Sequence, residues 1–208
     1  MSFAAAFDPF AARLAATGAW FGARSIRAGD ETAFRDAALE STPANLARRR
    51  ASGAARILAA HMFARLGLED AKVGRAVGGA PVWPTGLVGS IAHDETTAII
   101  AFARSGGPIK ALGVDIEPAE PLPGDLADYV LTQDERRSFA GEPLAGRMVF
   151  AAKEAVYKAV HPLDGAALDY ADIVCDARMS AATLRDGRRL ALVTTSAPRV
   201  LAAAFLVD

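Results

Sequence analysis

Two short acidic motifs carry the residue types best suited to chemistry in this 208-residue chain. Asp115 and Glu117 stand at i and i+2 after an apolar run, so a β-strand would point both carboxylates to one face. Glu154 and Lys158 stand four residues apart, which places them on one stripe of a helix. Together these side chains supply three hard oxygen ligands and an ammonium group. That combination suits a Mg²⁺ ion that holds a pyrophosphate.

Each motif also has a purely structural interpretation. An Asp-x-Glu sequence is a common polar strand end, and a Glu–Lys pair at i, i+4 stabilises a surface helix by roughly 0.2–0.5 kcal/mol. Val114 and Ile116 favour the functional interpretation, because they would fix the alternate strand face into the core. Two carboxylates held side by side repel each other, so a cation is expected between them.

Lysine usage gives a second indication. The chain has 23 basic residues, of which four are lysines, so 19 are arginines. Two of the four lysines, Lys153 and Lys158, flank Glu154. Either this pairing is a coincidence, or a compact ammonium group is favoured there over a planar guanidinium. On a helical wheel Lys158 lies with Glu154, whereas Lys153 points more nearly the other way.

Composition limits the function classes. The net charge of −1 gives no argument for nucleic-acid binding, and the hydrophobic fraction of 52% is enough for a packed core. The single cysteine, Cys175, excludes an internal disulfide and suits a reducing compartment. No apolar run reaches the length of a membrane span. We expect a soluble cytoplasmic protein without stable membrane insertion.

The periodicity of the chain predicts an α+β fold. A helix is expected to begin at Thr42 and Pro43 and to reach about residue 66. A second long helix is expected over 144–161, closed by Pro162, and a capping box at Thr132 and Glu135 predicts a short helix before it. Strands are expected over 87–92, 97–103, 111–117, 191–195 and 199–207. Strand pairs separated by long helices fit two similar halves, 1–104 and 105–208, rather than regular β-α-β alternation.

Basic residues of the first predicted helix form a second candidate site. Arg48, Arg49 and Arg56 are either a solvated face or a phosphate clamp, since the guanidinium group matches phosphate geometry. His93 lies in a predicted turn between two strands. It is either structural or a group that donates to a phosphate or stacks on a base.

Several motifs, in order along most of the chain, resemble the 4′-phosphopantetheinyl transferases of the Sfp/EntD type. Gly113-Val114-Asp115-Ile116-Glu117 and Phe150-Ala151-Ala152-Lys153-Glu154-Ala155-Val156-Tyr157-Lys158 resemble the paired signature of that family. Gly79-Ala80-Pro81-Val82-Trp83-Pro84 and Gly89-Ser90-Ile91-Ala92-His93 resemble two further family segments. The residues from Phe150 to Asp169 are most similar to the branch that primes enterobactin-type siderophore synthetases. The resemblance implies the pseudo-twofold α+β fold of that family and a monomer.

The resemblance also implies an activity and residue roles. The family transfers the 4′-phosphopantetheine group of coenzyme A to a serine of an apo acyl, peptidyl or aryl carrier protein, releasing adenosine 3′,5′-bisphosphate. Asp115, Glu117 and Glu154 would bind Mg²⁺, and Lys158 would neutralise charge on the pyrophosphate. Glu154, or a metal-bound water, would accept the serine proton. The residues expected to bind coenzyme A are Arg48, Arg49, Arg56, Gly79, Pro81, His93, Lys153 and Lys158. The half 1–104 would hold the adenosine 3′-phosphate, and 105–208 would hold the metal and the pyrophosphate.

Two positions depart from the family pattern and keep alternatives open. Ala92 stands where Ser or Thr is usual, and Ala55 stands where Gly precedes the arginine of the basic helix. Ala92 alone motivates the second hypothesis, a homologue that binds coenzyme A or a nucleotide without transferring anything. A metal-dependent phosphohydrolase that uses the same carboxylates is the third. Siderophore, other nonribosomal peptide, polyketide and fatty-acid pathways all remain open.

Overall fold

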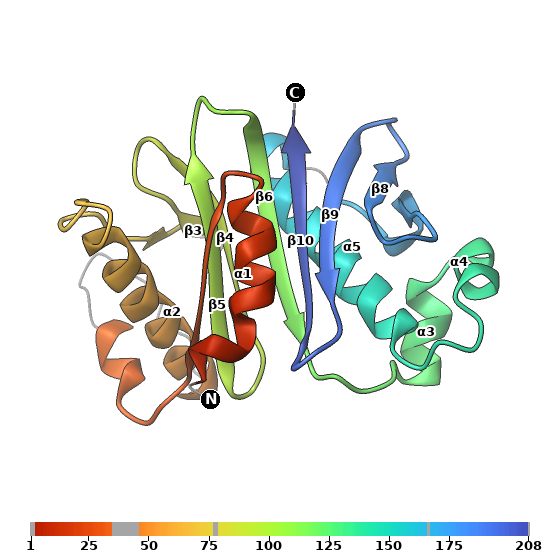
Figure 1. Cartoon of the computed structure of the whole chain (residues 1–208), viewed down its shortest axis with the longest axis horizontal. Coiled ribbons are helices and arrows are strands. Elements are labelled where there is room, and N and C mark those ends of the chain that lie inside the picture. Colours follow the sequence, from red (N-terminus) through yellow and green to blue (C-terminus); the bar gives the residue numbers. More distant parts are fainter. Residues whose placement is uncertain (1–2, 35–45, 77–78, 166, 208) are drawn as a thin grey trace.

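The computed structural model describes residues 3–34, 46–76, 79–165 and 167–207, and it has the predicted α+β fold (Figure 1). The α-helices are α1 (Asp8–Ala15), α2 (Leu46–Ala64), α3 (Gly124–Val130), α4 (Gln133–Ser138) and α5 (Ala145–Asp164). Short 3₁₀ helices are η1 (Ala4–Phe7), η2 (Asp30–Phe34) and η3 (Tyr170–Asp172). The strands are β1 (Trp20–Ser25), β2 (Gly74–Arg75), β3 (Pro81–Val82), β4 (Leu87–His93), β5 (Thr97–Arg104), β6 (Ile109–Glu117), β7 (Ile173–Cys175), β8 (Ala181–Leu184), β9 (Arg189–Thr195) and β10 (Val200–Val207).

The strands form two larger antiparallel sheets and one small hairpin. The first sheet has the order β1-β5-β4, and the second has the order β6-β10-β9-β8-β7. β2 and β3 form a separate two-stranded hairpin. β4 of the first sheet packs along β6 of the second, so the two sheets meet at these strands (Figure 1).

The alternation of side chains along two strands explains the layers. On β5, Ile99 and Ala101 face a core shared with β6 and β10, whereas Ile100 and Phe102 face α2. On β10, odd-numbered residues join the shared core and even-numbered residues pack against α5. Each sheet therefore carries one long helix on its outer face, and α1 covers part of the shared core (Figure 1).

Most predicted elements are confirmed, with one helix end corrected. Thr132 and Glu135 form the predicted capping box, each side chain bonding the backbone N–H of the other residue. Pro162 does not end α5, which continues to Asp164 and stops at Gly165. Proline in the last turn forfeits only its own N–H bond, and Gly165, with φ of 67°, supplies the left-handed cap. The predicted helix start at Thr42 and Pro43 lies outside the described residues. No helix among the described residues is long and apolar enough to span a membrane.

One glycine sets the distance between β6 and α5. A Cβ atom on Gly113 would lie 1.9 Å from the carbonyl oxygen of Ala155 and 2.6 Å from the nitrogen of Ala159. The helix backbone therefore rests directly on the strand backbone, which only glycine permits. Gly113 shares a strand face with Asp115 and Glu117. The contact at Gly113 therefore sets how close the side chains of α5 come to these two carboxylates.

We expect Gly113→Ala to lower the free energy of unfolding by roughly 2–3 kcal/mol, because α5 must move away from β6. The matched control is Gly146→Ala, whose new Cβ would make only ordinary side-chain contacts, with Leu122 at 3.4 Å and Leu131 at 3.7 Å. Because alanine favours the helical conformation more than glycine does, this change in the first turn of α5 should be neutral or stabilise by up to about 1 kcal/mol. Chemical denaturation measures both; a Gly113→Ala protein as stable as wild type would contradict the close contact.

Candidate active site

The predicted acidic residues lie together where β6 meets α5. Asp115 and Glu117 occupy the face of β6 opposite to Val114 and Ile116, which are buried in the shared core. Glu154 and Lys158 face them from α5, and the Nζ atom of Lys158 lies 2.5 Å from Oδ1 of Asp115. The Asp115 side chain is 8% exposed, whereas that of Lys158 is 30% exposed, so the lysine reaches the surface of the site.

Burial strongly affects the ionisation of Asp115. Burial, assisted by the charges of Glu117 and Glu154, raises the pKa of the carboxyl group from 3.8 to about 7 against the attraction of Lys158. The Oδ2 atom of Asp115 is buried without a hydrogen-bond partner. An acceptor in that state is costly unless a proton or a cation reaches it.

The other two carboxylates each have a different donor. Glu117 accepts a hydrogen bond from Nη1 of Arg147 at 2.9 Å, and burial still raises its pKa against that charge. Glu154 accepts one from the hydroxyl of Tyr170 at 2.5 Å. Among the described residues, no three His, Cys, Asp or Glu side chains stand close enough to hold a metal ion as they are placed. In this arrangement each carboxylate is held by its own donor instead.

The donor set nevertheless fits Mg²⁺. This ion commonly takes one or two carboxylates from a protein and fills its other positions with water or phosphate oxygens. Oδ2 of Asp115 has no protein partner, and Glu117 and Glu154 are near enough for their charges to act on Asp115. The fit therefore rests on an unsatisfied buried oxygen rather than on a closed cage of ligands.

The predicted basic residues fall into two groups. His93 ends β4 beside the acidic site, where burial lowers its pKa and the charges of Lys158 and Arg48 lower it further. Arg49 lies near Arg48 on α2 and has a buried Nε atom without a hydrogen-bond partner. Arg56 lies farther along α2, at the β2–β3 hairpin that contains Pro81.

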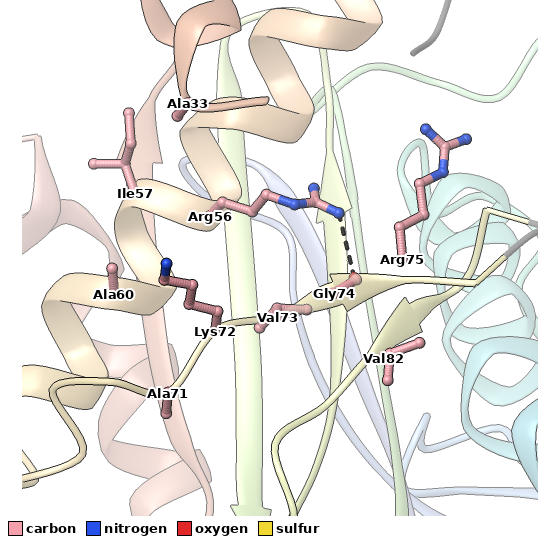
Figure 2. Close-up of a pocket in the computed structure, with 10 residues that line it drawn as sticks. All are labelled: Ala33, Arg56, Ile57, Ala60, Ala71, Lys72, Val73, Gly74, Arg75 and Val82. Carbon is pink, nitrogen blue, oxygen red and sulfur yellow. Dashed lines mark hydrogen bonds between the residues drawn. The ribbon is translucent and has the colours of Figure 1, made fainter. Parts of the chain in front are cut away.

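A pocket of about 480 Å³ lies at Arg56 (Figure 2). Arg56 extends from α2 to Gly74, and its Nη2 atom donates to the Gly74 carbonyl oxygen at 3.3 Å. Lys72 and Arg75 also line the pocket, and its remaining lining is largely apolar. The predicted Gly79 lies against Arg75, since a Cβ there would approach its Nη2 to 2.9 Å.

A second cleft, of about 430 Å³, is lined by residues from both 1–104 and 105–208. Its lining includes Pro81 and Trp83 from the hairpin segment and Lys158 and Leu163 from α5. Lys158 therefore lies both at the acidic group and in the wall of a largely apolar cleft. The hairpin residue Pro81 and Lys158 therefore line the same cleft.

Comparison with known proteins decides the family. A model of the 4′-phosphopantetheinyl transferase N-terminal domain matches residues 35–103, and a model of the 4′-phosphopantetheinyl transferase superfamily matches residues 111–200. The chain belongs to the 4′-phosphopantetheinyl transferase superfamily. The second match contains all four residues of the acidic site.

Three curated members of the superfamily show the extent of the similarity. The 4′-phosphopantetheinyl transferase Svp of Streptomyces mobaraensis is 38% identical over 123 residues, 55% of this chain and 49% of that protein. The transferase Npt of Nocardia iowensis is 37% identical over 119 residues, 56% and 53% of the two chains. Enterobactin synthase component D of Salmonella typhimurium is 37% identical over 112 residues, 51% and 45%. The match thus spans about half the length of these relatives.

The structure corrects the assignment of Lys153 to coenzyme A binding. Its side chain is fully buried on the other side of α5. The ammonium group donates to Oε2 of Glu135 and the carbonyl of Val130, both at 2.8 Å, and to the carbonyl of Tyr170 at 3.0 Å. These three acceptors use all three of its hydrogens, so no donor is left for a pyrophosphate.

Sequence reasoning gave no role to two residues that contact the acidic site. Arg147 lies on the same helix face as Glu154, and that spacing was a usable signal. It binds Glu117 and also donates to the carbonyls of Glu120 and Pro121. Tyr170 carries no local signal, because it follows Glu154 by 16 residues and lies on a different element.

The two departures from the family pattern face the core. Ala92 is 4% exposed and packs in the core shared by the two sheets. Ala55 is fully buried between α2 and β5. Neither side chain lines either pocket. Ala92 was the reason for considering a homologue without transferase activity, and in this chain its side chain serves the packing of the core.

The raised pKa of Asp115 predicts how the stability of the metal-free protein depends on pH. Between pH 4 and 7 the unfolded chain loses the proton that the folded protein keeps, so stability falls as pH rises and levels off above about 7. Asp115→Asn removes this dependence. At pH 8 we expect the metal-free variant to be more stable than wild type by roughly 2–4 kcal/mol, with little difference at pH 4. Thermal unfolding across this range measures the effect; a difference that does not change with pH would contradict it.

Proposed function

We propose that this chain transfers the 4′-phosphopantetheine group of coenzyme A to a serine of an apo acyl, peptidyl or aryl carrier protein. The observation that carries the proposal is the unsatisfied buried oxygen of Asp115 beside Lys158, within the part of the chain that matches the superfamily. The serine Oγ attacks the β-phosphorus of coenzyme A, and the bond from that phosphorus to the bridging oxygen breaks. Adenosine 3′,5′-bisphosphate leaves.

The acidic residues would hold the metal that this reaction needs. Asp115, through Oδ2, together with Glu117 and Glu154, would bind Mg²⁺, which would neutralise charge on the pyrophosphate. Lys158 would turn from Asp115 toward the pyrophosphate oxygens, as its partly exposed position allows. Transfer of this kind depends on positioning and charge neutralisation more than on a covalent group of the enzyme.

Glu154 is the proposed acceptor of the serine proton. The Tyr170 hydroxyl donates to Oε1 of Glu154, and no hydrogen bond to its Oε2 is found in the described part of the chain. Proton transfer to Oε2 would accompany the attack of the serine oxygen and so avoid a charged intermediate on the serine. Asp115 and Glu117 are less suited, because the free oxygen of Asp115 would be bound to the metal and Arg147 already pairs with Glu117.

The nucleotide end would lie with the basic residues of the half 1–104. Arg48, Arg49, Arg56 and His93 are the proposed ligands of the adenosine 3′-phosphate, with Gly79 and Pro81 of the hairpin segment next to the base. Arg56, Arg75 and Lys72 line one largely apolar pocket, which suits an adenosine whose ribose carries a phosphate (Figure 2). The half 105–208 would hold the metal and the pyrophosphate. The apolar cleft at Lys158 suits the pantetheine arm.

The proposed setting is a monomer in the cytoplasm that serves siderophore synthesis or another nonribosomal peptide or polyketide pathway. The support for a siderophore pathway is the similarity to enterobactin synthase component D. The net charge of −1 supports the expectation that nucleic acid is not a partner.

Incubation with coenzyme A, Mg²⁺ and a panel of apo carrier proteins tests the function. We expect the mass of phosphopantetheine to be added to the serine of at least one carrier, and chelation of the metal to abolish the addition. Consumption of coenzyme A without a carrier would indicate a phosphohydrolase instead. Binding of coenzyme A without any mass gain across the panel would indicate a homologue that does not transfer.

Lys158→Arg tests the role of the compact ammonium group. The wider guanidinium would crowd the space between Asp115 and the cleft, so we expect kcat to fall about 100-fold although the charge is kept. Thermal unfolding is the control and should change little, because the side chain is partly exposed. Turnover close to wild type would contradict the proposed contact with the pyrophosphate.

A further inference from the structure

Two adjacent residues of α5 hold opposite ends of one tyrosine. Lys153 donates to the backbone carbonyl of Tyr170 at 3.0 Å, and the side-chain hydroxyl of Tyr170 donates to Oε1 of Glu154 at 2.5 Å. Successive side chains of a helix point about 100° apart, so Lys153 and Glu154 leave α5 in different directions. Tyr170 spans the space between them.

We propose that Tyr170 is the positioning residue for Glu154, and that the buried Lys153–Glu135 ion pair fixes Tyr170 for this task. The inference rests on the proposed role of Glu154 as a metal ligand and proton acceptor. The hydroxyl holds Oε1 and so directs Oε2 toward the metal and the serine. The Lys-Glu pair of the motif then has two separate functions, one structural and one chemical.

The anchor of Tyr170 is a fully satisfied buried cluster. Lys153 and Glu135 are 0% and 2% exposed and pair at 2.8 Å. Glu135 also accepts the backbone N–H groups of Thr132 and Cys175. A buried charge without its partners costs several kcal/mol, so this cluster tolerates essentially one geometry. The backbone carbonyl of Tyr170 accepts from Lys153 in this cluster, so the cluster also fixes the position of the Tyr170 backbone.

The ring of Tyr170 is held as well as its backbone. It packs edge-on against Tyr129, with ring centroids 5.4 Å apart, and against Phe150 at 5.8 Å. A capping box between Asp169 and Asp172 fixes the short helix that carries it. The hydroxyl is therefore delivered to Glu154 by a rigid support, the arrangement by which outer residues orient a ligating side chain.

Glu154 needs such support more than Asp115 does. Asp115 has a short side chain on β6, which pairs with β10 and packs along β4, and it is nearly buried, so its position follows from the backbone. Glu154 is only half-buried on a helix and has one more rotatable bond. A hydrogen bond from a fixed hydroxyl restricts the side-chain rotation of Glu154 before the substrate arrives. The entropy lost by ordering this side chain then does not weaken binding.

Tyr170→Phe tests this inference on the full-length chain, because it removes the hydroxyl and keeps the ring. Mn²⁺ serves as the probe for the metal and is titrated in the presence of coenzyme A, with free Mn²⁺ measured by electron paramagnetic resonance. We expect about tenfold weaker Mn²⁺ binding than wild type, with an unchanged melting temperature. The matched control is Tyr129→Phe, which removes a hydroxyl from the same aromatic cluster and should bind Mn²⁺ like wild type.

A double-mutant cycle separates positioning from a general structural effect. If Tyr170 acts through Glu154, then Tyr170→Phe should have no further effect on Mn²⁺ affinity in a Glu154→Gln background. Equal Mn²⁺ affinity of Tyr170→Phe and wild type would overturn the positioning role and leave the proposed function intact. Equal losses in both backgrounds would also overturn it. A wild-type protein that binds no Mn²⁺ with coenzyme A would overturn the proposed metal site itself, and the inference with it.

Discussion

The contact of two backbones at Gly113 is the constraint on which the site depends. Because the strand has no side chain there, α5 lies against β6 closely enough for Lys158 to reach Asp115. The same contact places Glu154 beside the strand carboxylates, so that the three charges act on one another. The acidic site is thus a consequence of how one helix packs on one sheet. The glycine of the first motif and the lysine of the second are two parts of a single geometric requirement.

The electrostatics of the site follow from that packing. Three carboxylates are brought together, and each is compensated by a different donor: Lys158 for Asp115, Arg147 for Glu117 and Tyr170 for Glu154. One buried oxygen of Asp115 is left over. A cation would satisfy that oxygen and release Lys158 for a phosphate, so metal and substrate binding are expected to reinforce each other. The burial of Asp115 is unfavourable for that residue alone, and in the proposed function it would favour the binding of a metal pyrophosphate.

The elements that local sequence patterns determine were predicted correctly. The strands that carry Asp115 and His93, the helix that carries Glu154 and the capping box at Thr132 follow from side-chain alternation, helical spacing and capping chemistry. The preference for lysine at position 153 was recognised, but its cause was not. An ammonium group with three separate hydrogens suits the three acceptors around Lys153, and those acceptors lie on other elements. Tyr170 was missed for the same reason, since only the tertiary fold brings it to Glu154.

The most direct test of this account is the position of the metal in crystals grown with coenzyme A and Mn²⁺ and examined by anomalous diffraction. The account predicts a single strong anomalous peak in contact with Oδ2 of Asp115 and with Glu117 or Glu154, bridged to the pyrophosphate. It also predicts that Lys158 has moved from Asp115 to the phosphates. A pyrophosphate bound elsewhere, or an ion that leaves Asp115 paired only with Lys158, would contradict it.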